Sequence, residues 1–474
     1  MKRTLIAGTL ILVCVFTLGL AASAQSGVTT DPDIVTMVNS ISADRIQNTS
    51  LTMQNFFTRQ SCSGTIGTGQ GVTPARDYIY NQYTSLQGLQ VQLDQFTHPN
   101  CSTNPTYNVI AWIPGTVNPN QLVIVGGHYD SRTINVLDST SYAPGGNDSG
   151  GQTGIVLEMA KAFTGHSFNS TVVFMSFSGE EQGLYGSAEI SSNLSKYFPN
   201  PQVIAMLNTD IPGGDQLANN SADLQQFRVY SPGIPRERFS GDPDGTTDNT
   251  SPSRGVMRYV GTWGGAYVPG FTMVPILRED RPGRSSDHAS FINEGFPAVR
   301  IMERFECSPS PVDNSCAGPF PCPPTPLPSA TCMNPNTAHQ HSPVDLNQYI
   351  TPSYAANIAK VMTGVAATLA RAPGSPLDLL AAGNATQGVR LTFLLPKGGA
   401  DHYIAAARSV NENFYRQRIV VTPGSNQIIT PQQLGFNPGD AFFISVAAVD
   451  AAGHESLFAY PEMRCDTTAC VAVQ

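Results

Sequence analysis

The chain has few charged residues and no concentration of positive charge. Asp, Glu, Lys and Arg together make up 13% of its 474 residues, and the formal net charge is −9. Proteins that bind nucleic acids gather Lys and Arg on one face or along one helix, and no such basic cluster occurs here. We therefore exclude nucleic acid from the expected partners.

Long apolar runs are also scarce, and the clearest one lies at the N-terminus. Leu5–Leu20 is apolar, follows Lys2 and Arg3, and precedes the small residues Ala22, Ser23 and Ala24. This order of a basic start, a short apolar stretch and small residues is typical of a secretory signal peptide; an uncleaved anchor is the alternative. We predict that residues 1–24 are removed, that no later segment spans a membrane, and that the protein is secreted or periplasmic.

Cysteine is sparse as well, with nine residues in the chain. Loss of the leader removes Cys14 and leaves an even number, which in an exported chain indicates disulfides. We expect Cys62 to pair with Cys101 and Cys465 with Cys470. A zinc site built from cysteines is less favoured, because paired C-x-x-C units are missing. Four cysteines lie in a Pro-rich stretch where sequence does not fix the pairing: Cys307, Cys316, Cys322 and Cys332.

The middle of the chain alternates apolar runs with amphipathic ones. Strand-like runs occupy 107–115, 121–127, 171–177 and 202–210, and helical runs occupy 152–163 and 183–198. This alternation predicts an α/β fold with a mainly parallel sheet. Flanking segments are less regular: 33–95 reads as helical, with its clearest helix at Pro74–Leu89, 211–286 as an insertion or set of loops, and 351–371 as a closing helix.

The C-terminal part has a different pattern. Ala372–Pro376 ("APGSP") reads as a linker, and short alternating runs follow it. Such runs predict a small all-β sandwich over residues 377–474. Its closing "SVAAVDAAGHES" resembles the last strand pair of fibronectin type III domains, and we expect a fold of that kind. This part contains no group of residues that indicates catalysis.

Four successive junctions between a strand and a helix each carry a side chain of the kind that binds metal ions. In open α/β sheets, ligands bind at the carboxyl ends of the strands, so these side chains should lie together. His341, near the end of the same segment, adds a second histidine. The junction residues are His128, Asp148, the adjacent pair Glu180 and Glu181, and Asp210.

Histidines mixed with carboxylates, without cysteine, favour zinc or a similar divalent ion. The number of carboxylates favours two zinc ions, with Asp148 bridging them. One ion would take His128 and Asp210, and the other would take Glu181 and His341. Two ions about 3.5–4 Å apart can polarise a carbonyl and activate a water together.

The adjacent glutamates then have separate roles. Glu181 neutralises its charge on a metal ion, and Glu180 remains as the general base, which takes a proton from water and passes it to the leaving amine. Asp130 is expected to orient the ring of His128, and Asp345 that of His341, because carboxylates beside metal-bound histidines commonly do so.

The stretches "GGHYDS", "GGNDSGG", "GEEQGLYGS", "LNTD" and "HSPVD" together resemble the motif series of the M28 zinc aminopeptidase family. The resemblance covers residues 50–370, and it implies a phosphorylase/hydrolase-like three-layer α/β/α sandwich for residues 25–371. It also implies a di-zinc centre with Glu180 as acid and base. The implied ligands are His128, Asp148, Glu181, Asp210 and His341.

Two details of the resemblance leave choices open. The final histidine usually follows an aromatic residue, and here it stands in "HQHSP", so His339 is the alternative to His341. "SSDHASF" also resembles a family segment near the pocket, which implies that Asp287 and His288 lie beside the ligands.

The leading functional prediction is an exported aminopeptidase acting on peptide or protein substrates. A carboxypeptidase or a glutaminyl cyclase of the same family is the alternative, with a substrate carboxylate bound by one of three arginines. A metal-binding adhesion protein without activity is less favoured, because no ligand or base is missing. The arginines are Arg278, Arg281 and Arg284.

Four aromatic residues in the irregular segment are expected to pack loops rather than line a pocket: Tyr259, Trp263, Tyr267 and Phe271.

Overall fold

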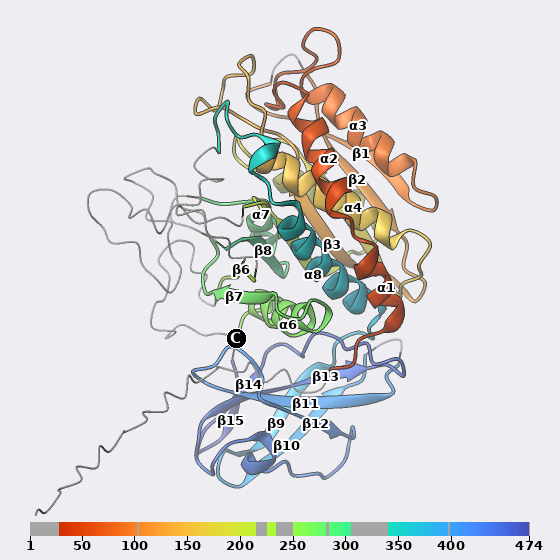
Figure 1. Cartoon of the computed structure of the whole chain (residues 1–474). Helices are drawn as coiled ribbons and strands as arrows, with labels where there is room; N and C mark the ends of the chain where they lie inside the picture. Colours follow the sequence, from red (N-terminus) through yellow and green to blue (C-terminus); the bar gives the residue numbers. More distant parts are fainter. Residues whose placement is uncertain are drawn as a thin grey trace, which may run out of the picture.

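The computed structural model describes residues 28–101, 104–214, 225–233, 250–280, 284–304, 340–396 and 399–473 (Figure 1). Within these ranges, no helix combines the length and the apolar character that a membrane span requires. Several predictions fall outside the described residues: the leader at 1–24, the four cysteines of the Pro-rich stretch, Arg281 and His339.

An eight-stranded mixed sheet forms the centre of the larger part of the chain, in the order β1-β2-β4-β3-β5-β8-β6-β7. The four central strands β4, β3, β5 and β8 run parallel to their neighbours, while β2 and β6 join them antiparallel. This confirms the predicted mainly parallel sheet. The strands are β1 (Gln90–Phe96), β2 (Thr106–Ile113), β3 (Asn118–His128), β4 (Ser170–Phe177), β5 (Gln202–Thr209), β6 (Gln226–Tyr230), β7 (Thr272–Ile276) and β8 (Ala298–Glu303).

Helices cover both faces of this sheet, because the central strands are apolar on both sides. Val123 and Val125 of β3 face one core, while Ile124 between them faces the other. Figure 1 shows α2, α4 and α8 lying across the first face. The three-layer α/β/α prediction is therefore confirmed. The helices on the first face are α1 (Pro32–Ser40), α2 (Ala43–Gln54), α3 (Val72–Thr84), α4 (Gln152–Phe163), α6 (Pro252–Tyr267) and α8 (Pro352–Arg371), and those on the second are α5 (Tyr185–Ser192) and α7 (His288–Asn293).

Three sequence predictions need correction. Gln90–Phe96 forms the edge strand β1, where a helical segment was expected, and α3 ends at Thr84 rather than at Leu89. Pairing with β2 decides this, since strand formation depends on the neighbour as much as on the segment itself. Residues 211–286 are not only loops, for they supply β6, α6 and β7. Their aromatic residues pack in the core, which confirms packing over a pocket lining, although three of them lie on a helix rather than in loops: Tyr259, Trp263, Tyr267 and Phe271.

The C-terminal strands have a core of their own. The predicted linker at 372–376 lies between the end of α8 and the start of β9. Both expected disulfides form, Cys62–Cys101 and Cys465–Cys470. The fibronectin type III assignment stays a prediction. The strands are β9 (Leu377–Asn384) and β10 (Gly388–Leu394) in one sheet, and β11 (His402–Ser409), β12 (Gln417–Val421), β13 (Phe442–Val449), β14 (Met463–Cys465) and β15 (Cys470–Ala472) in the other.

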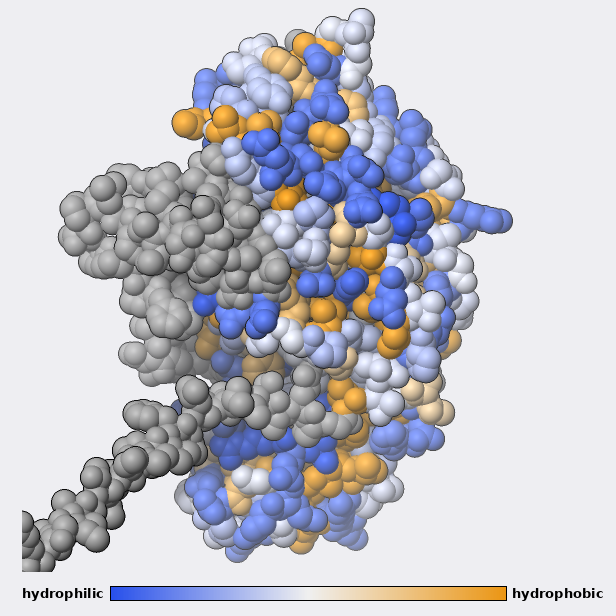
Figure 2. Space-filling view, viewed as in Figure 1, coloured by the Kyte–Doolittle hydropathy of each residue, from blue (hydrophilic) through white to orange (hydrophobic). Residues whose placement is uncertain are grey.

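Figure 1 shows the C-terminal strands lying next to α6, and buried charged groups join the two. Arg258 of α6 donates to Glu462 at 2.9 Å, and Arg408 and Tyr415 donate to the same carboxylate at 2.7 Å. On the face drawn in Figure 2, hydrophobic residues are scattered among hydrophilic ones over the described surface. Apolar residues scattered singly over a surface are normal and need no special explanation.

Candidate metal centre

The predicted ligands lie at one edge of the sheet, where the parallel strands end. His128 is the last residue of β3, Glu180 and Glu181 follow β4, and Asp210 follows β5. Asp148 lies in the glycine-rich turn that precedes α4. The strands approach closely here: a Cβ atom on Gly127 would come within 2.8 Å of the carbonyl oxygen of Thr209. This close packing brings residues from separate strands into one cluster.

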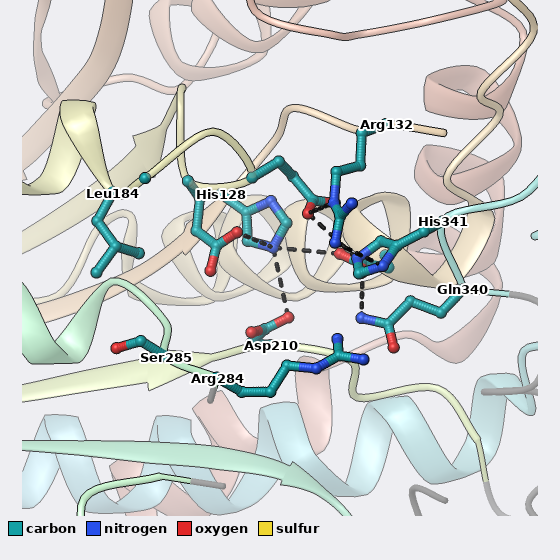
Figure 3. Close-up of a pocket in the computed structure, with 12 residues that line it drawn as sticks. His128, Arg132, Leu184, Asp210, Arg284, Ser285, Gln340 and His341 are labelled. Atoms are coloured by element: carbon teal, nitrogen blue, oxygen red, sulfur yellow. Dashed lines mark hydrogen bonds and ion pairs between the residues drawn. The ribbon is translucent and has the colours of Figure 1, made fainter. Parts of the chain in front are cut away.

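The first group in the cluster contains His128, Asp148 and Asp210. The Nε2 atom of His128 lies 3.2 Å from Oδ1 of Asp148 and 3.4 Å from Oδ1 of Asp210. All three side chains are at most 5% exposed. In Figure 3 the ring of His128 and the carboxylate of Asp210 point toward one another.

The second group contains His341, Asp148 and Glu181. The Nε2 atom of His341 lies 3.2 Å from Oδ2 of Asp148 and 3.2 Å from Oε2 of Glu181. Asp148 therefore faces both histidines, with one carboxylate oxygen directed at each. His341 stands where the sequence predicted the second histidine, just before the segment that leads into α8.

These residues fit a divalent cation. In each group the candidate ligand atoms lie within 4.8 Å of one another. Oδ1 of Asp148 and Oε1 of Glu181 are buried and accept no hydrogen bond from the described residues, and burying carboxylates in that state is costly unless a cation offsets the charge. Imidazole nitrogens and carboxylate oxygens without thiolate suit zinc.

The carboxylates of the cluster favour the protonated form of both histidines. Burial alone would lower the pKa of His128, but the neighbouring carboxylates, Glu180 foremost, hold that pKa well above its ordinary value. Burial would likewise lower the pKa of His341, and Glu181 and Asp148 hold it above the ordinary value. Excess negative charge at one buried point is what a cation site requires.

Asp130 contacts both His128 and the turn that carries the glutamates. The Nδ1 atom of His128 donates to the carbonyl oxygen of Asp130 at 3.2 Å, which leaves Nε2 directed at the cluster. The carboxylate of Asp130 lies 3.5 Å from the same Nδ1 atom. It also accepts from the backbone amides of Glu180 at 3.4 Å and Glu181 at 3.2 Å. Asp130 thus fixes the ring and the glutamate turn relative to each other.

Glu180 stands apart from the tightest contacts. Its Oε2 atom lies 4.0 Å from Nε2 of His128, farther than the other carboxylates around that atom. With His128 and Glu181 it forms a further group whose candidate ligand atoms lie within 4.8 Å of one another. Burial raises the pKa of Glu180 well above its ordinary value, and the Asp210 and Glu181 carboxylates add to the rise.

Two arginines that the sequence analysis did not single out contact the candidate ligands. Arg132 donates from Nε to Oε2 of Glu181 at 2.7 Å and from Nη2 to Nδ1 of His341 at 2.8 Å. Arg300 of β8 lies with Nη2 2.8 Å from Oδ2 of Asp210. An arginine inside the apolar strand "AVRIME" was the available signal for Arg300, because a buried charge in a strand demands a partner.

The prediction for Asp345 was wrong. Its carboxylate accepts from the backbone amides of Asn147 at 3.0 Å and Asp148 at 3.1 Å, while Nδ1 of His341 faces Arg132. Of the two residues that were expected beside the ligands, Asp287 is fully buried, and burial raises its pKa to about 7. His288 donates to the carbonyl oxygen of Glu279 at 2.9 Å and lies 3.9 Å from Asp280.

A cavity of ≈ 270 Å³ opens over the cluster. Leu184, Arg284 and Ser285 complete its wall, and Figure 3 shows Arg284 directed along the floor toward Gln340. Of the predicted arginines, Arg284 therefore lines the cavity, whereas Arg278 is buried and does not line it.

Comparisons with known proteins identify related sequences. The sequence model of peptidase family M28 matches residues 108–366. A probable zinc metalloprotease of Pyrenophora teres f. teres is 28% identical over 373 residues, which cover 74% of this chain and 71% of the relative. One of Leptosphaeria maculans is 28% identical over 377 residues, covering 74% and 79%.

The solved structures include a similar fold. The aminopeptidase LapA of Legionella pneumophila superposes with a TM-score of 0.51 at 17% sequence identity, covering 73% of this chain and 77% of LapA. At that identity the likeness shows a shared fold.

Proposed function

The chain belongs to peptidase family M28, a family of zinc metallopeptidases, and from this premise we propose that it is an exported di-zinc aminopeptidase that removes N-terminal residues from peptides. The observation that carries the proposal is the shared carboxylate of Asp148, which lies 3.2 Å from the Nε2 atoms of both His128 and His341. A carboxylate held between two histidines, each with one further carboxylate, matches the ligand set of a two-metal site.

The residues divide into two ligand sets. His128 and Asp210 would hold one zinc ion, Glu181 and His341 the other, and Asp148 would reach both. When bound, zinc polarises the scissile carbonyl and lowers the pKa of a coordinated water. Of the carboxylates that line the cavity in the described part of the chain, Glu180 is the one left outside both ligand sets.

Glu180 acts as the general base and then as the general acid. Its carboxylate lies beside the His128 group but 4.0 Å from Nε2, which leaves it available to accept a proton from water and deliver it to the leaving amine. A proton acceptor works best when its pKa is near the working pH, and the burial of Glu180 raises its pKa in that direction. Asp130 holds the amide of Glu180 and so fixes the start of that side chain.

Recognition of a free N-terminus follows from the charges around the cavity. A protonated amine needs hydrogen-bond acceptors, and Glu180 and Asp210 line the cavity at its His128 end. Export is supported by the sequence of the leader and by the disulfides Cys62–Cys101 and Cys465–Cys470, which persist in oxidising compartments.

A carboxypeptidase is the second candidate, and one observation favours it. The guanidinium groups of Arg132 and Arg284 both line the cavity, and arginine binds carboxylates through two parallel hydrogen bonds. A C-terminal carboxylate placed against Arg284 would put the last peptide bond over the same cluster.

The test is hydrolysis of a panel of aminoacyl chromogenic substrates, run beside the same residues N-acetylated, with zinc and with a chelator. We expect release from free-amine substrates alone, loss on chelation, and loss in Glu180→Gln. Glu189→Gln on α5, outside the cavity, is the matched control and should retain activity. Zinc content should be two ions per chain.

The other outcomes are equally informative. Release of C-terminal residues from N-blocked peptides, lost in Arg284→Met, would replace the aminopeptidase assignment with the carboxypeptidase one. Two bound zinc ions with no release from either panel would overturn the peptidase proposal. One bound ion would overturn the two-metal site.

A further inference from the structure

Arg300 joins the candidate ligand Asp210 to a second buried carboxylate. Its Nη2 atom lies 2.8 Å from Oδ2 of Asp210, and its Nη1 atom donates to Oδ1 of Asp280 at 2.7 Å. Arg300 is 0% exposed, and Asp280 is 1% exposed. A guanidinium this deeply buried needs both charges, because desolvation of an unpaired arginine is costly.

The register of the sheet explains how Arg300 reaches Asp210. In the parallel pair β5 and β8, Asn208 lies opposite Arg300. Asp210 stands two residues further and therefore on the same face of the sheet. Its backbone amide donates to the carbonyl oxygen of Ile301 at 3.2 Å. Strand β8 thus holds both the backbone and the side chain of Asp210.

The two oxygens of Asp210 have different partners. Oδ2 faces Arg300, whereas Oδ1 faces Nε2 of His128 at 3.4 Å, inside the first ligand group. The ion pair therefore leaves Oδ1 of Asp210 available as a candidate ligand atom. Arg300 pairs with Asp210 through one nitrogen and donates to Asp280 through the other, so a buried ion pair anchored on a second carboxylate holds Oδ2 of Asp210 in place.

Arg132 differs from Arg300 because it contacts the same oxygen of its carboxylate partner, Glu181, that the neighbouring histidine His341 contacts. It donates to Oε2 of Glu181, which is also the oxygen 3.2 Å from Nε2 of His341. Its side chain is 21% exposed, whereas that of Arg300 is fully buried. Arg132 therefore contacts the same Glu181 oxygen that faces His341, whereas Arg300 contacts the Asp210 oxygen that does not face His128.

We propose that Arg300 is a positioning residue for the candidate zinc site of His128, Asp148 and Asp210, where its ion pair with Oδ2 of Asp210 keeps Oδ1 facing the other residues that would hold the ion. The inference rests on the proposed di-zinc function. Without the guanidinium, Asp210 can rotate its carboxylate, and its charge faces that of Asp280 without compensation. Partners that orient a metal ligand typically change metal affinity 10–100-fold when removed.

A purely structural role makes a different prediction. If Arg300 only joined β8 to β5, its loss would lower stability and leave zinc affinity unchanged in the folded protein. Arg408 provides the matched control, because it is also fully buried and binds both oxygens of a buried carboxylate, Glu462, far from the cluster. Zinc affinity therefore separates the two roles.

The experiment measures the two zinc dissociation constants of the full mature chain by competition with a chromophoric chelator, with folding checked by circular dichroism. In Arg300→Met we expect one constant to rise about 10–100-fold and the other to change less than about threefold. Arg300→Lys keeps the charge but cannot bridge both carboxylates, so an intermediate rise is expected. Arg408→Met should leave both constants within about threefold of the wild type.

Each result has a clear reading. Unchanged constants in a folded Arg300→Met, or an equal change in Arg408→Met, overturn the positioning role. If Arg300→Met does not fold, Arg300→Lys decides: a rise of about fivefold or more in one constant supports the role, and no rise overturns it. A wild-type chain that binds fewer than two zinc ions contradicts the proposed function instead.

Discussion

The carboxylate of Asp345 binds the backbone of Asp148 at the centre of the cluster. Oδ2 of Asp345 accepts the amide hydrogen of Asp148 at 3.1 Å, and Oδ1 accepts that of Asn147 at 3.0 Å. Asp345 is 1% exposed. It therefore holds the turn from which the Asp148 carboxylate reaches both His128 and His341.

The first prediction concerns the substitution Asp345→Asn. An amide side chain has a single acceptor oxygen, so one of the two backbone amides loses its partner. We expect zinc affinity and kcat/KM to fall about 10–100-fold, because the shared ligand Asp148 is no longer fixed. Metal competition and hydrolysis of an aminoacyl chromogenic substrate measure the two effects.

Asp94→Asn is the control for this prediction. Asp94 is a buried carboxylate that accepts from Asn108, Lys196 and Tyr197, away from the cluster. Its substitution should lower stability and leave zinc affinity as it is. Equal losses of affinity in both variants would show that Asp345 has no specific role.

The candidate ligands could be predicted because topology gathers them. Parallel strands end at one edge of a sheet, so residues that follow β3, β4 and β5 must meet there. The apolar runs that mark these strands are visible in the sequence, and the ligand types stand at their ends. The role of each residue remains a proposal.

The partners of the ligands could not be predicted in the same way. Asp345 lies four residues after His341, and that nearness suggested a contact, yet the chain turns so that its carboxylate faces Asn147 and Asp148. Arg300 meets Asp210 through the register of β5 and β8, which no local pattern reports. Likewise β1 forms because β2 pairs with it.

The second prediction concerns the substitution Asp130→Asn. The carboxylate accepts from the amides of Glu180 and Glu181 and lies beside Nδ1 of His128. An Asn side chain in its place offers one acceptor oxygen, and its NH2 group faces groups that are themselves hydrogen-bond donors. We expect kcat to fall about 100-fold or more, with a smaller change in KM, because the general base is displaced while the cavity remains.

Ser61→Ala calibrates this effect. The Ser61 hydroxyl donates to Oδ2 of Asp130 at 3.3 Å. We expect less than about a fivefold fall in kcat from its removal, in line with one neutral hydrogen bond. A similar fall in Asp130→Asn would contradict the positioning of the glutamate turn by Asp130.

The third prediction compares the two disulfides. Cys62–Cys101 closes a loop with a sequence separation of 39, and Cys465–Cys470 closes one of 5. Chain entropy assigns about 4 kcal/mol to the longer loop and about 2 kcal/mol to the shorter one. Replacing both cysteines of a pair by serine should therefore lower the free energy of unfolding more for Cys62–Cys101.

Activity should separate the pairs as well. Cys62 neighbours Ser61, which contacts Asp130, so loss of Cys62–Cys101 is expected to lower kcat as well as stability. Loss of Cys465–Cys470 should leave kcat unchanged, because that pair joins β14 to β15. An equal effect of the two changes on kcat would argue against a link between the longer disulfide and the site.

The fourth prediction concerns the contact between α6 and the C-terminal strands. Burial favours a proton on Glu462, but Arg258 and Arg408 outweigh it and hold the pKa of this carboxyl below its ordinary value of 4.5. A carboxyl with a lowered pKa stabilises the fold in its ionised form, fully above the unfolded value. That stabilisation is lost as the pH falls below about 4.5.

Glu462→Gln therefore has an effect that depends on pH. At pH 7 it leaves Arg258 and Arg408 buried without their shared anion, and the loss of one partner in a buried pair costs about 3–5 kcal/mol. As the pH falls below 4.5 and through the lower pKa of the folded wild-type carboxyl, that carboxyl takes up a proton, so the difference between the two proteins should shrink. Denaturant unfolding from pH 7 to pH 3.5 measures this. The control is Glu412→Gln, which breaks an exposed pair with Arg416 and should cost less than about 1 kcal/mol. If the stability difference caused by Glu462→Gln did not depend on pH, the ionised carboxylate of Glu462 would be ruled out as the cause of that difference.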